Sequence, residues 1–399
     1  MNWLKYAPAT VKCLFVWLLA TAFSSAESNA QIMRLPHADT TSGNYFGTSV
    51  ALDGVRAMVG ASAEDSCGED SGAAYVYLHN DSTGYWEEEA RLVPSDCKGG
   101  LFFGRRVALQ GNFAMVASSR ELVAVQAPNI VYMFRRDSSG TWRETQRLTS
   151  PREIDEGAFG AALVLDQERA VITTAGDAVR ARQGAAYVYE FRDGLWQLTA
   201  RLTGSLGVRA GIFGGDAALA GDVLAVTSSG YFSRRPGSVY LFDYEPEEVW
   251  SEVARIPEVV DFFISVDIFE NELLVGQAHS GRDNTGSATL YARDSTGTWQ
   301  LAATLSPPTT YSGGRFGTEV ALYGDRALAV GYDEQFKLDF NIDRVVYVYA
   351  REDGVWRYQG IIDIGQVAFG TAIDLQGNTA LIGAASVDMP GAAYVIRIP

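Results

Sequence analysis

The sequence has few of the residues that usually carry metal or nucleophilic chemistry. Among 399 residues there are only 3 cysteines and 3 histidines. The histidines, His37, His79 and His279, fall at unrelated points of the chain. This spacing predicts neither a two-histidine metal site nor a histidine base beside a nucleophile, so we expect all three to be surface residues.

Positive charge is also scarce. The chain carries 32 Lys and Arg against 48 Asp and Glu, a formal net charge of −16, and no basic cluster stands out. Electrostatic binding of phosphate groups or anionic lipid is therefore not expected. Nucleic acid is excluded as an expected partner.

The chain has one long apolar run, and it lies near the N-terminus. Cys13–Phe23 (CLFVWLLATAF) follows two lysines and precedes a series of small residues. This order is typical of a secretory signal peptide cleaved after Ala26 or Ala30, and the alternative is a buried N-terminal helix. We predict that residues 1–30 are removed. Residues 31–399 would then form one domain without a membrane span, secreted to the extracellular space or the periplasm.

Two aromatic markers repeat in phase after residue 30. A Phe-Gly pair, or its relic in the fifth copy, recurs at Phe46-Gly47, Phe103-Gly104, Phe159-Gly160, Phe213-Gly214, Phe262-Phe263, Phe316-Gly317 and Phe369-Gly370. A tryptophan near the end of each of the first six copies recurs at a similar interval, at Trp86, Trp142, Trp196, Trp250, Trp299 and Trp356. Their regular place favours packing between repeats over carbohydrate stacking.

Within each copy the apolar residues alternate with period two, which predicts β-strands. The sixth copy shows four such segments, at Gly317–Leu322, Arg326–Gly331, Val345–Ala350 and Val355–Ile362. Short turns rich in Gly, Asp and Asn separate the first two strands of most copies. Seven copies of an antiparallel four-stranded meander predict an all-β fold, a seven-bladed β-propeller.

The two ends of the chain predict how this ring closes. The seventh copy stops after its third strand, but Gln31–Pro36 matches the fourth-strand segments Glu89–Pro94 and Ala302–Pro307. The N-terminal strand is therefore expected to complete the last blade and to leave no open edge there.

These residues resemble the FG-GAP repeat proteins, whose seven-bladed propeller also forms the head of integrin α chains. The resemblance covers residues 31–399. It rests on Phe46-Gly47, Val59-Gly60-Ala61 and Gly72–Tyr77, and on their counterparts near residues 369–395. It implies the propeller fold and the short repeat found in secreted bacterial proteins.

Calcium binding is not implied, because the family's Asp-rich calcium loop is replaced by short turns in every copy. One acidic pattern remains: Asp339, Asn341 and Asp343 alternate in the loop between the second and third strands of the sixth copy. This spacing suits a hard cation such as calcium, but it lacks the following glycine and the distal acid, and the alternative is a solvated loop. No other cofactor is expected.

Export would remove Cys13 and leave Cys67 and Cys97 in an oxidising compartment. Cys67 lies between the second and third strands of the first copy, and Cys97 lies between the first two copies. In an up-down meander these loops emerge on the same face. We therefore predict a disulfide, with two free thiols as the alternative.

The same face carries the long and varied loops, so we expect a ligand to dock there. Aromatic and arginine side chains are the usual anchors of interfaces, although ordinary loop filling is the alternative for each of them. The candidates are Arg180, Arg182, Tyr231, Phe232, Arg234, Arg235, Arg282, Tyr332 and Phe336.

Three classes of function stay open. The first is a recognition or adhesion module that binds an extracellular protein or glycan. The second is a propeller enzyme acting on polysaccharide at the mouth of the central channel, and the third is a structural envelope protein. Against the enzyme, there is no Gly-x-Ser-x-Gly elbow, no phosphate-binding glycine loop, and no evident polar cluster that breaks the repeat near the innermost strands.

Overall fold

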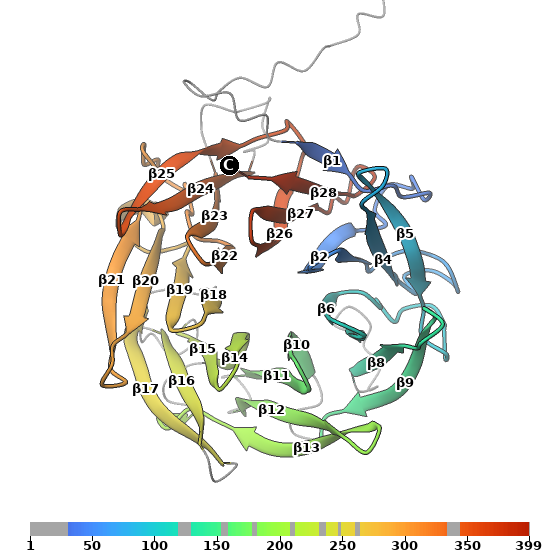
Figure 1. Ribbon diagram of the computed structural model, residues 1–399, viewed down its shortest axis with the longest axis horizontal. Coiled ribbons are helices and arrows are strands. Elements are labelled where there is room, and N and C mark those ends of the chain that lie inside the picture. The colour runs from blue at the N-terminus through green and yellow to red at the C-terminus, as the bar shows by residue number, and fades with distance from the viewer. Residues whose placement is uncertain are drawn as a thin grey trace, which may run out of the picture.

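The chain folds into a ring of seven sheets, each with four antiparallel strands (Figure 1). The computed structural model describes residues 31–118, 129–152, 159–177, 182–207, 212–230, 237–245, 249–259, 264–332 and 344–398. The complete helical segment among these residues is the short 3₁₀ helix η3 (Arg282–Asn284). The predicted seven-bladed propeller is confirmed.

Consecutive strands form each of blades 1 to 6. Blade 1 has β2 (Phe46–Asp53), β3 (Arg56–Ala61), β4 (Ala73–Asn80) and β5 (Tyr85–Leu92), and blade 2 has β6 (Arg106–Gln110), β7 (Phe113–Ala117), β8 (Ile130–Arg136) and β9 (Trp142–Thr149). Blade 3 has β10 (Phe159–Asp166), β11 (Arg169–Asp177), β12 (Arg182–Arg192) and β13 (Leu195–Leu202), and blade 4 has β14 (Ile212–Ala220), β15 (Val223–Ser229), β16 (Gly237–Glu245) and β17 (Val249–Val259). Blade 5 has β18 (Ile264–Phe269), β19 (Glu272–Gln277), β20 (Ser287–Arg293) and β21 (Trp299–Leu305), and blade 6 has β22 (Val320–Tyr323), β23 (Arg326–Tyr332), β24 (Arg344–Glu352) and β25 (Val355–Ile362).

Blade 7 joins the two ends of the described chain. It contains β26 (Phe369–Gln376), β27 (Thr379–Ala384), β28 (Ala392–Arg397) and the N-terminal strand β1 (Ile32–Arg34). β1 pairs antiparallel with β28, with Met33 opposite Val395, and the N–H of Leu35 donates to the carbonyl of Ala393 at 2.9 Å. The expected closure of the ring is therefore confirmed.

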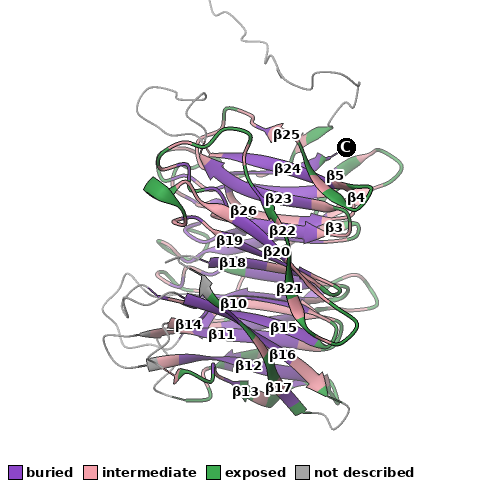
Figure 2. Cartoon of the chain, turned by 90° about the vertical axis from the view of Figure 1, so that its left-hand side faces the viewer, coloured by how far each residue is buried: buried purple, intermediate pink, exposed green. Residues whose placement is uncertain are grey.

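The hydrophobic core is divided into seven clusters, and each cluster lies between two neighbouring blades. The phenylalanine of each described Phe-Gly pair is at most 2% exposed, and its ring packs edge-on against a tyrosine of the third strand, as Phe103 does against Tyr132. Figure 2 shows buried residues along the inner and middle strands and exposed ones on outer strands such as β21. The aromatic repeats thus serve packing between blades.

The two faces of the ring differ in their connections. On one face, which we call the turn face, two residues join the first and second strands of every blade, as Gly54 and Val55 do in blade 1, and two to five residues join the third and fourth strands of blades 1 to 6. On the opposite face, which we call the loop face, the connections between second and third strands run from four residues (178–181) to twelve (118–129). Variation between blades is therefore concentrated on the loop face.

Side-chain oxygens fasten four of the innermost strands to the preceding blade. An innermost strand is the edge of its sheet, so the N–H groups on its free side have no neighbouring strand in that sheet. Oxygens of the preceding blade accept from them: Ser49 from Val107 N at 3.0 Å, Asp216 from Val266 N at 3.0 Å, Ser265 from Val320 N at 3.2 Å, Asp267 from Leu322 N at 2.7 Å and Asp374 from Leu52 N at 2.7 Å. The last bond crosses the closing interface between blade 7 and blade 1.

Candidate functional site

A disulfide joins two loops on the loop face, as predicted. Cys67 lies in the β3–β4 loop and Cys97 in the connection from β5 to β6, and their Cα atoms are 5.6 Å apart. The same loops are also joined by the backbone, because Gly100 N donates to the carbonyl of Glu69 at 2.8 Å. These contacts hold the loop face of blade 1 in one arrangement.

Next to the disulfide, an exposed arginine, a buried tyrosine and a buried carboxylate form a hydrogen-bonded group in blade 1. Arg91 on β5 lies opposite Tyr75 on β4, with its guanidinium carbon 5.9 Å from the ring centroid. The Tyr75 hydroxyl donates to Glu64 Oε2 at 2.6 Å, and Arg91 Nε donates to Glu64 Oε1 at 3.1 Å. Glu64 is only 6% exposed, so the pairing with Arg91 compensates the charge that burial would otherwise penalise.

Blade 2 repeats this arrangement with a carboxylate from a different loop. Arg147 lies opposite Tyr132, with its guanidinium carbon 5.5 Å from the ring centroid. The Tyr132 hydroxyl donates to Asp96 Oδ1 at 3.0 Å, and Arg147 lies 3.3 Å from Asp96 Oδ2. In both blades a carboxylate bridges the guanidinium and the phenol, and we call this set the arginine–tyrosine–carboxylate triad.

His37 corrects the expectation of three surface histidines. Its ring stacks on Phe46 with centroids 3.9 Å apart, and Nδ1 is buried without a hydrogen-bond partner. Burial lowers the pKa of His37 below its ordinary value, against the raising effect of Glu64 and Asp39. The expectation failed because the residues that cover His37 lie in β2 and in the β3–β4 loop, and the sequence around His37 does not show these contacts.

His37, Asp39 and Glu64 bring three metal-ligand atoms within 4.8 Å of one another. The amide of Asn44 fills this group as a donor, because Asn44 Nδ2 lies 3.2 Å from His37 Nε2 and 3.3 Å from Asp39 Oδ2. Its oxygen accepts from Phe46 N at 3.0 Å, which fixes the orientation of the amide. A cation would meet the amide hydrogens, so we interpret the group as part of the ring closure and not as a metal site.

Few of the predicted ligand residues lie in the described part of the chain. Arg282 is exposed on η3, and Tyr332 ends β23; both lie on the loop face. Arg182 begins β12, but its side chain is outside the described residues, as are Arg180, Tyr231, Phe232, Arg234, Arg235, Phe336 and the acidic residues Asp339, Asn341 and Asp343.

Tyr332 belongs to a cluster that the sequence did not single out. The guanidinium carbons of Arg315 and Arg344 lie 5.9 and 5.6 Å from the centroid of its ring. Arg344 Nε donates to the Tyr332 hydroxyl at 3.3 Å. We call these three residues the blade 6 arginine–tyrosine cluster. The charge of Arg344 also acts on the carboxyl of Glu319, where it opposes the raising effect of burial on the pKa.

A polar cluster near the innermost strands was also missed. Asp216, Asp267, Glu319 and Asp374 come from blades 4 to 7, and their pKa values are raised, mainly by burial. The pKa of Asp267 is raised to about 8, and the charges of Asp374 and Asp216 contribute to that shift. Aligning the copies at their Phe-Gly pairs puts Asp216 level with Glu319, and Asp267 level with Asp374, which is a signal the sequence offered.

The three aspartates of this cluster have a structural role. Both oxygens of Asp267 accept backbone hydrogen bonds, from Leu322 N at 2.7 Å and from Ile268 N at 2.8 Å. Asp216 and Asp374 are bonded in the same way, each to the next residue and to the next blade. Each oxygen of these three carboxyl groups thus accepts a backbone bond, and one bond of each pair joins neighbouring blades.

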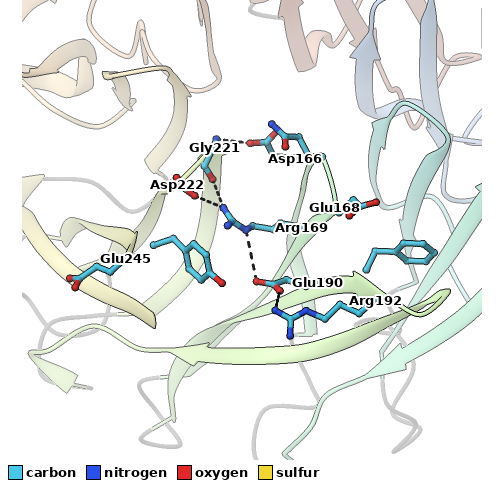
Figure 3. A pocket seen from close by; sticks show the side chains of 11 residues that line it. Asp166, Glu168, Arg169, Glu190, Arg192, Gly221, Asp222 and Glu245 are labelled. Atoms are coloured by element: carbon cyan, nitrogen blue, oxygen red, sulfur yellow. Dashed lines mark hydrogen bonds and ion pairs between the residues drawn. The ribbon is translucent and has the colours of Figure 1, made fainter. Parts of the chain in front are cut away.

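A cleft of about 700 Å³ opens on the turn face between blades 3 and 4 (Figure 3). At its centre Arg169 donates to Asp222 Oδ1 at 2.7 Å, and its guanidinium carbon lies 4.0 Å from the ring centroid of Tyr244. Figure 3 also shows Glu190 between Arg169 and Arg192. Carboxylates of the chain neutralise both arginines. We therefore interpret these arginines as structural contacts and not as a binding site for an anion.

Comparison with known families agrees with the fold. The family model described as FG-GAP repeat matches residues 30–77 and 86–123, which span β1, blade 1 and the first two strands of blade 2. No curated protein is significantly similar to the chain. The matched residues carry FG-GAP repeats, and the seven four-stranded blades around one axis are consistent with an FG-GAP propeller of the integrin α type.

Proposed function

We propose that the chain is a recognition module that binds an extracellular protein or glycan through its loop face. The observation that carries this proposal is the contrast between connections of two to five residues on one face and longer, blade-specific loops on the other. Functional residues concentrate on loops that a rigid scaffold positions. The disulfide between two loop-face segments supports this reading, because it fixes the loops without contributing to the blades themselves.

Export belongs to the same proposal. The Cys67–Cys97 disulfide fits an oxidising compartment outside the cytoplasm. No helix in the described residues is long and apolar enough to cross a membrane. The apolar run at residues 13–23 lies outside the described residues and keeps its interpretation as a signal peptide.

A binding experiment with variants on each face tests the proposal. The immobilised chain is offered a glycan array and an extracellular extract, and each captured partner is titrated. Replacing Tyr231 and Arg234 by alanine should weaken binding at least tenfold, about 1.4 kcal/mol, without changing the melting temperature. The matched control replaces Glu168 and Glu245 at the turn-face cleft by glutamine. Loss of binding in the control, with retention in the loop-face variant, would move the site to the other face.

A further inference from the structure

His37 occupies a place at the closing interface that other blades fill without a titratable side chain. It stands two residues after the buried Leu35, and its ring meets the edge of Tyr75 with centroids 4.8 Å apart. Gly204 lies against Tyr240 in a similar way, since a Cβ at Gly204 would meet that ring at 2.6 Å. The residues two positions after the corresponding leucines of blades 1, 2, 3 and 5 are Pro94, Ser150, Gly204 and Pro307. Packing at this place therefore does not require an imidazole.

Residues 36–45, which we call the closing segment, join β1 to β2 on the loop face. Asn44 fastens this segment to both neighbours. Its Oδ1 accepts from Phe46 N at 3.0 Å and from Gly391 N of blade 7 at 3.4 Å. Its carbonyl accepts from Ala63 N in the β3–β4 loop at 3.2 Å. The amide of Asn44 is thus a junction between the two ends of the described chain.

The orientation of this amide assigns the proton of His37. Because Oδ1 of Asn44 accepts, the group that lies 3.2 Å from His37 Nε2 is the Asn44 amide nitrogen, a donor. Nε2 must then accept, so a neutral His37 carries its hydrogen on Nδ1. Nδ1 is buried and has no hydrogen-bond partner among the described residues. The closed ring therefore fits the neutral imidazole.

A second proton on His37 conflicts with this arrangement. An N–H at Nε2 would point at the hydrogens of the Asn44 amide, donor against donor. Turning the amide over would offer its oxygen to His37, but it would also direct the amide hydrogens at the N–H groups of Phe46 and Gly391. Asn44 is 2% exposed, so water does not replace a bond that is lost there. Protonation therefore costs the junction one of its bonds.

Four charged groups act on His37, and they do not remove this conflict. They are Arg34 on β1, Asp39 in the closing segment, Glu64 in the β3–β4 loop and Arg91 on β5. Burial, the largest cause, lowers the pKa of His37, and the two arginines add to this, against the raising effect of the two carboxylates. Glu64 is already engaged by the Tyr75 hydroxyl and by Arg91.

We propose that His37 is a proton-sensitive latch on the closure of the ring: neutral His37 holds the closing segment, and protonation at Nε2 in a mildly acidic medium loosens it. The proton comes from solvent, and no other covalent bond changes. Because the closing segment is bonded to the loop that carries Cys67, acid alters this sector of the loop face. The latch concerns the closure alone and does not depend on which partner the chain binds.

Hydrogen exchange of the full disulfide-bonded chain at pH 7 and pH 5 tests the latch. After correction for the intrinsic pH dependence of exchange, the amides of residues 31–46 should open at least about threefold more often at pH 5. His37→Gln keeps an acceptor but does not titrate, and it should show equal opening at both pH values. The raised pKa values of Asp267 and Glu319 lie in or near this range, and the variant retains both groups. The control His79→Gln removes a histidine that is bonded to Asp81 on the turn face, and it should keep the pH dependence of the parent chain.

Two further measurements complete the test. Asn44→Ala should increase opening of the closing segment already at pH 7. Spectra of the parent chain with ¹⁵N-labelled histidine should show the His37 proton on Nδ1 at pH 7, which does not depend on the folding of any variant. A proton on Nε2 at pH 7, equal opening of the parent chain at both pH values, a pH dependence that persists in His37→Gln, or an Asn44→Ala variant that opens no more than the parent would each overturn the proposal.

Discussion

Truncation of Leu35 tests the closure of the ring by β1. Leu35 follows β1, is 2% exposed, and lies in the hydrophobic cluster between blades 7 and 1. Replacing a fully buried leucine by alanine removes transfer free energy and leaves a cavity, at a cost of about 2–5 kcal/mol. For a domain of about 370 residues the unfolding entropy is roughly 0.8 kcal/mol/K, so calorimetry should show a melting temperature lower by about 3–6 °C.

The repeat supplies a matched control for this experiment. Leu92 occupies the same position at the end of β5 in blade 1 and is 3% exposed. Leu92→Ala should therefore lower the melting temperature by a similar amount, whereas Ile32→Ala, at a residue 42% exposed, should lower it by less than about 1 °C. A normal melting curve for Leu35→Ala, beside a lowered one for Leu92→Ala, would mean that β1 does not close the ring.

Three further predictions concern covalent, electrostatic and steric contacts. The denatured chain should show no thiol before reduction, and replacing Cys67 and Cys97 by serine should lower the free energy of unfolding by about 3–4 kcal/mol, whereas two thiols reacting without reductant would contradict the bond. Because the folded pKa of Asp267 is raised to about 8, the folded state holds a proton that the unfolded state releases, so stability should fall as pH rises from about 4 to 8. Asp267→Asn should lessen that fall in denaturant titrations, and equal slopes would refute the cause. Gly383→Ala places a Cβ 2.0 Å from a backbone oxygen of blade 1 and should destabilise by about 1–3 kcal/mol, whereas Gly215→Ala meets only an ordinary contact and should cost less.

The fold could be predicted because its information is local and repeated. Period-two segments predict strands, and short turns between them predict antiparallel neighbours, so each blade follows from about fifty residues. Even the one distant pairing was predictable, since Gln31–Pro36 carries the pattern of a fourth strand. The disulfide followed because both cysteines lie in connections on the same face.

The candidate site was less predictable, because it depends on which residues meet across blades. Arg315 and Arg344 are 29 positions apart, and nothing in their local sequence shows that both lie beside Tyr332. The sequence predicted that His37 is a surface residue. Its stacking partner, Phe46, was assigned to packing between repeats, and nothing in the sequence showed that the ring of His37 packs on it. The cleft beside Arg169 depends on how two blades diverge at the turn face, which sequence spacing does not encode.

The bonds between innermost strands have a direction, since the side-chain oxygen belongs to one blade and the N–H to the next. Such a contact is heterologous: it joins the front of one unit to the back of another, and it forms a closed ring only if the rotation per unit divides a full turn. The bond from Leu52 N to Asp374, which joins blade 7 to blade 1, is of the same kind as the bonds between consecutive blades. The interface between blades 7 and 1 therefore uses the same kind of bond as other interfaces, in addition to the pairing of β1 with β28 that completes blade 7. The number of blades is set by the angle that each interface imposes, and substitutions that widen one interface act on all the others through the geometry of the ring.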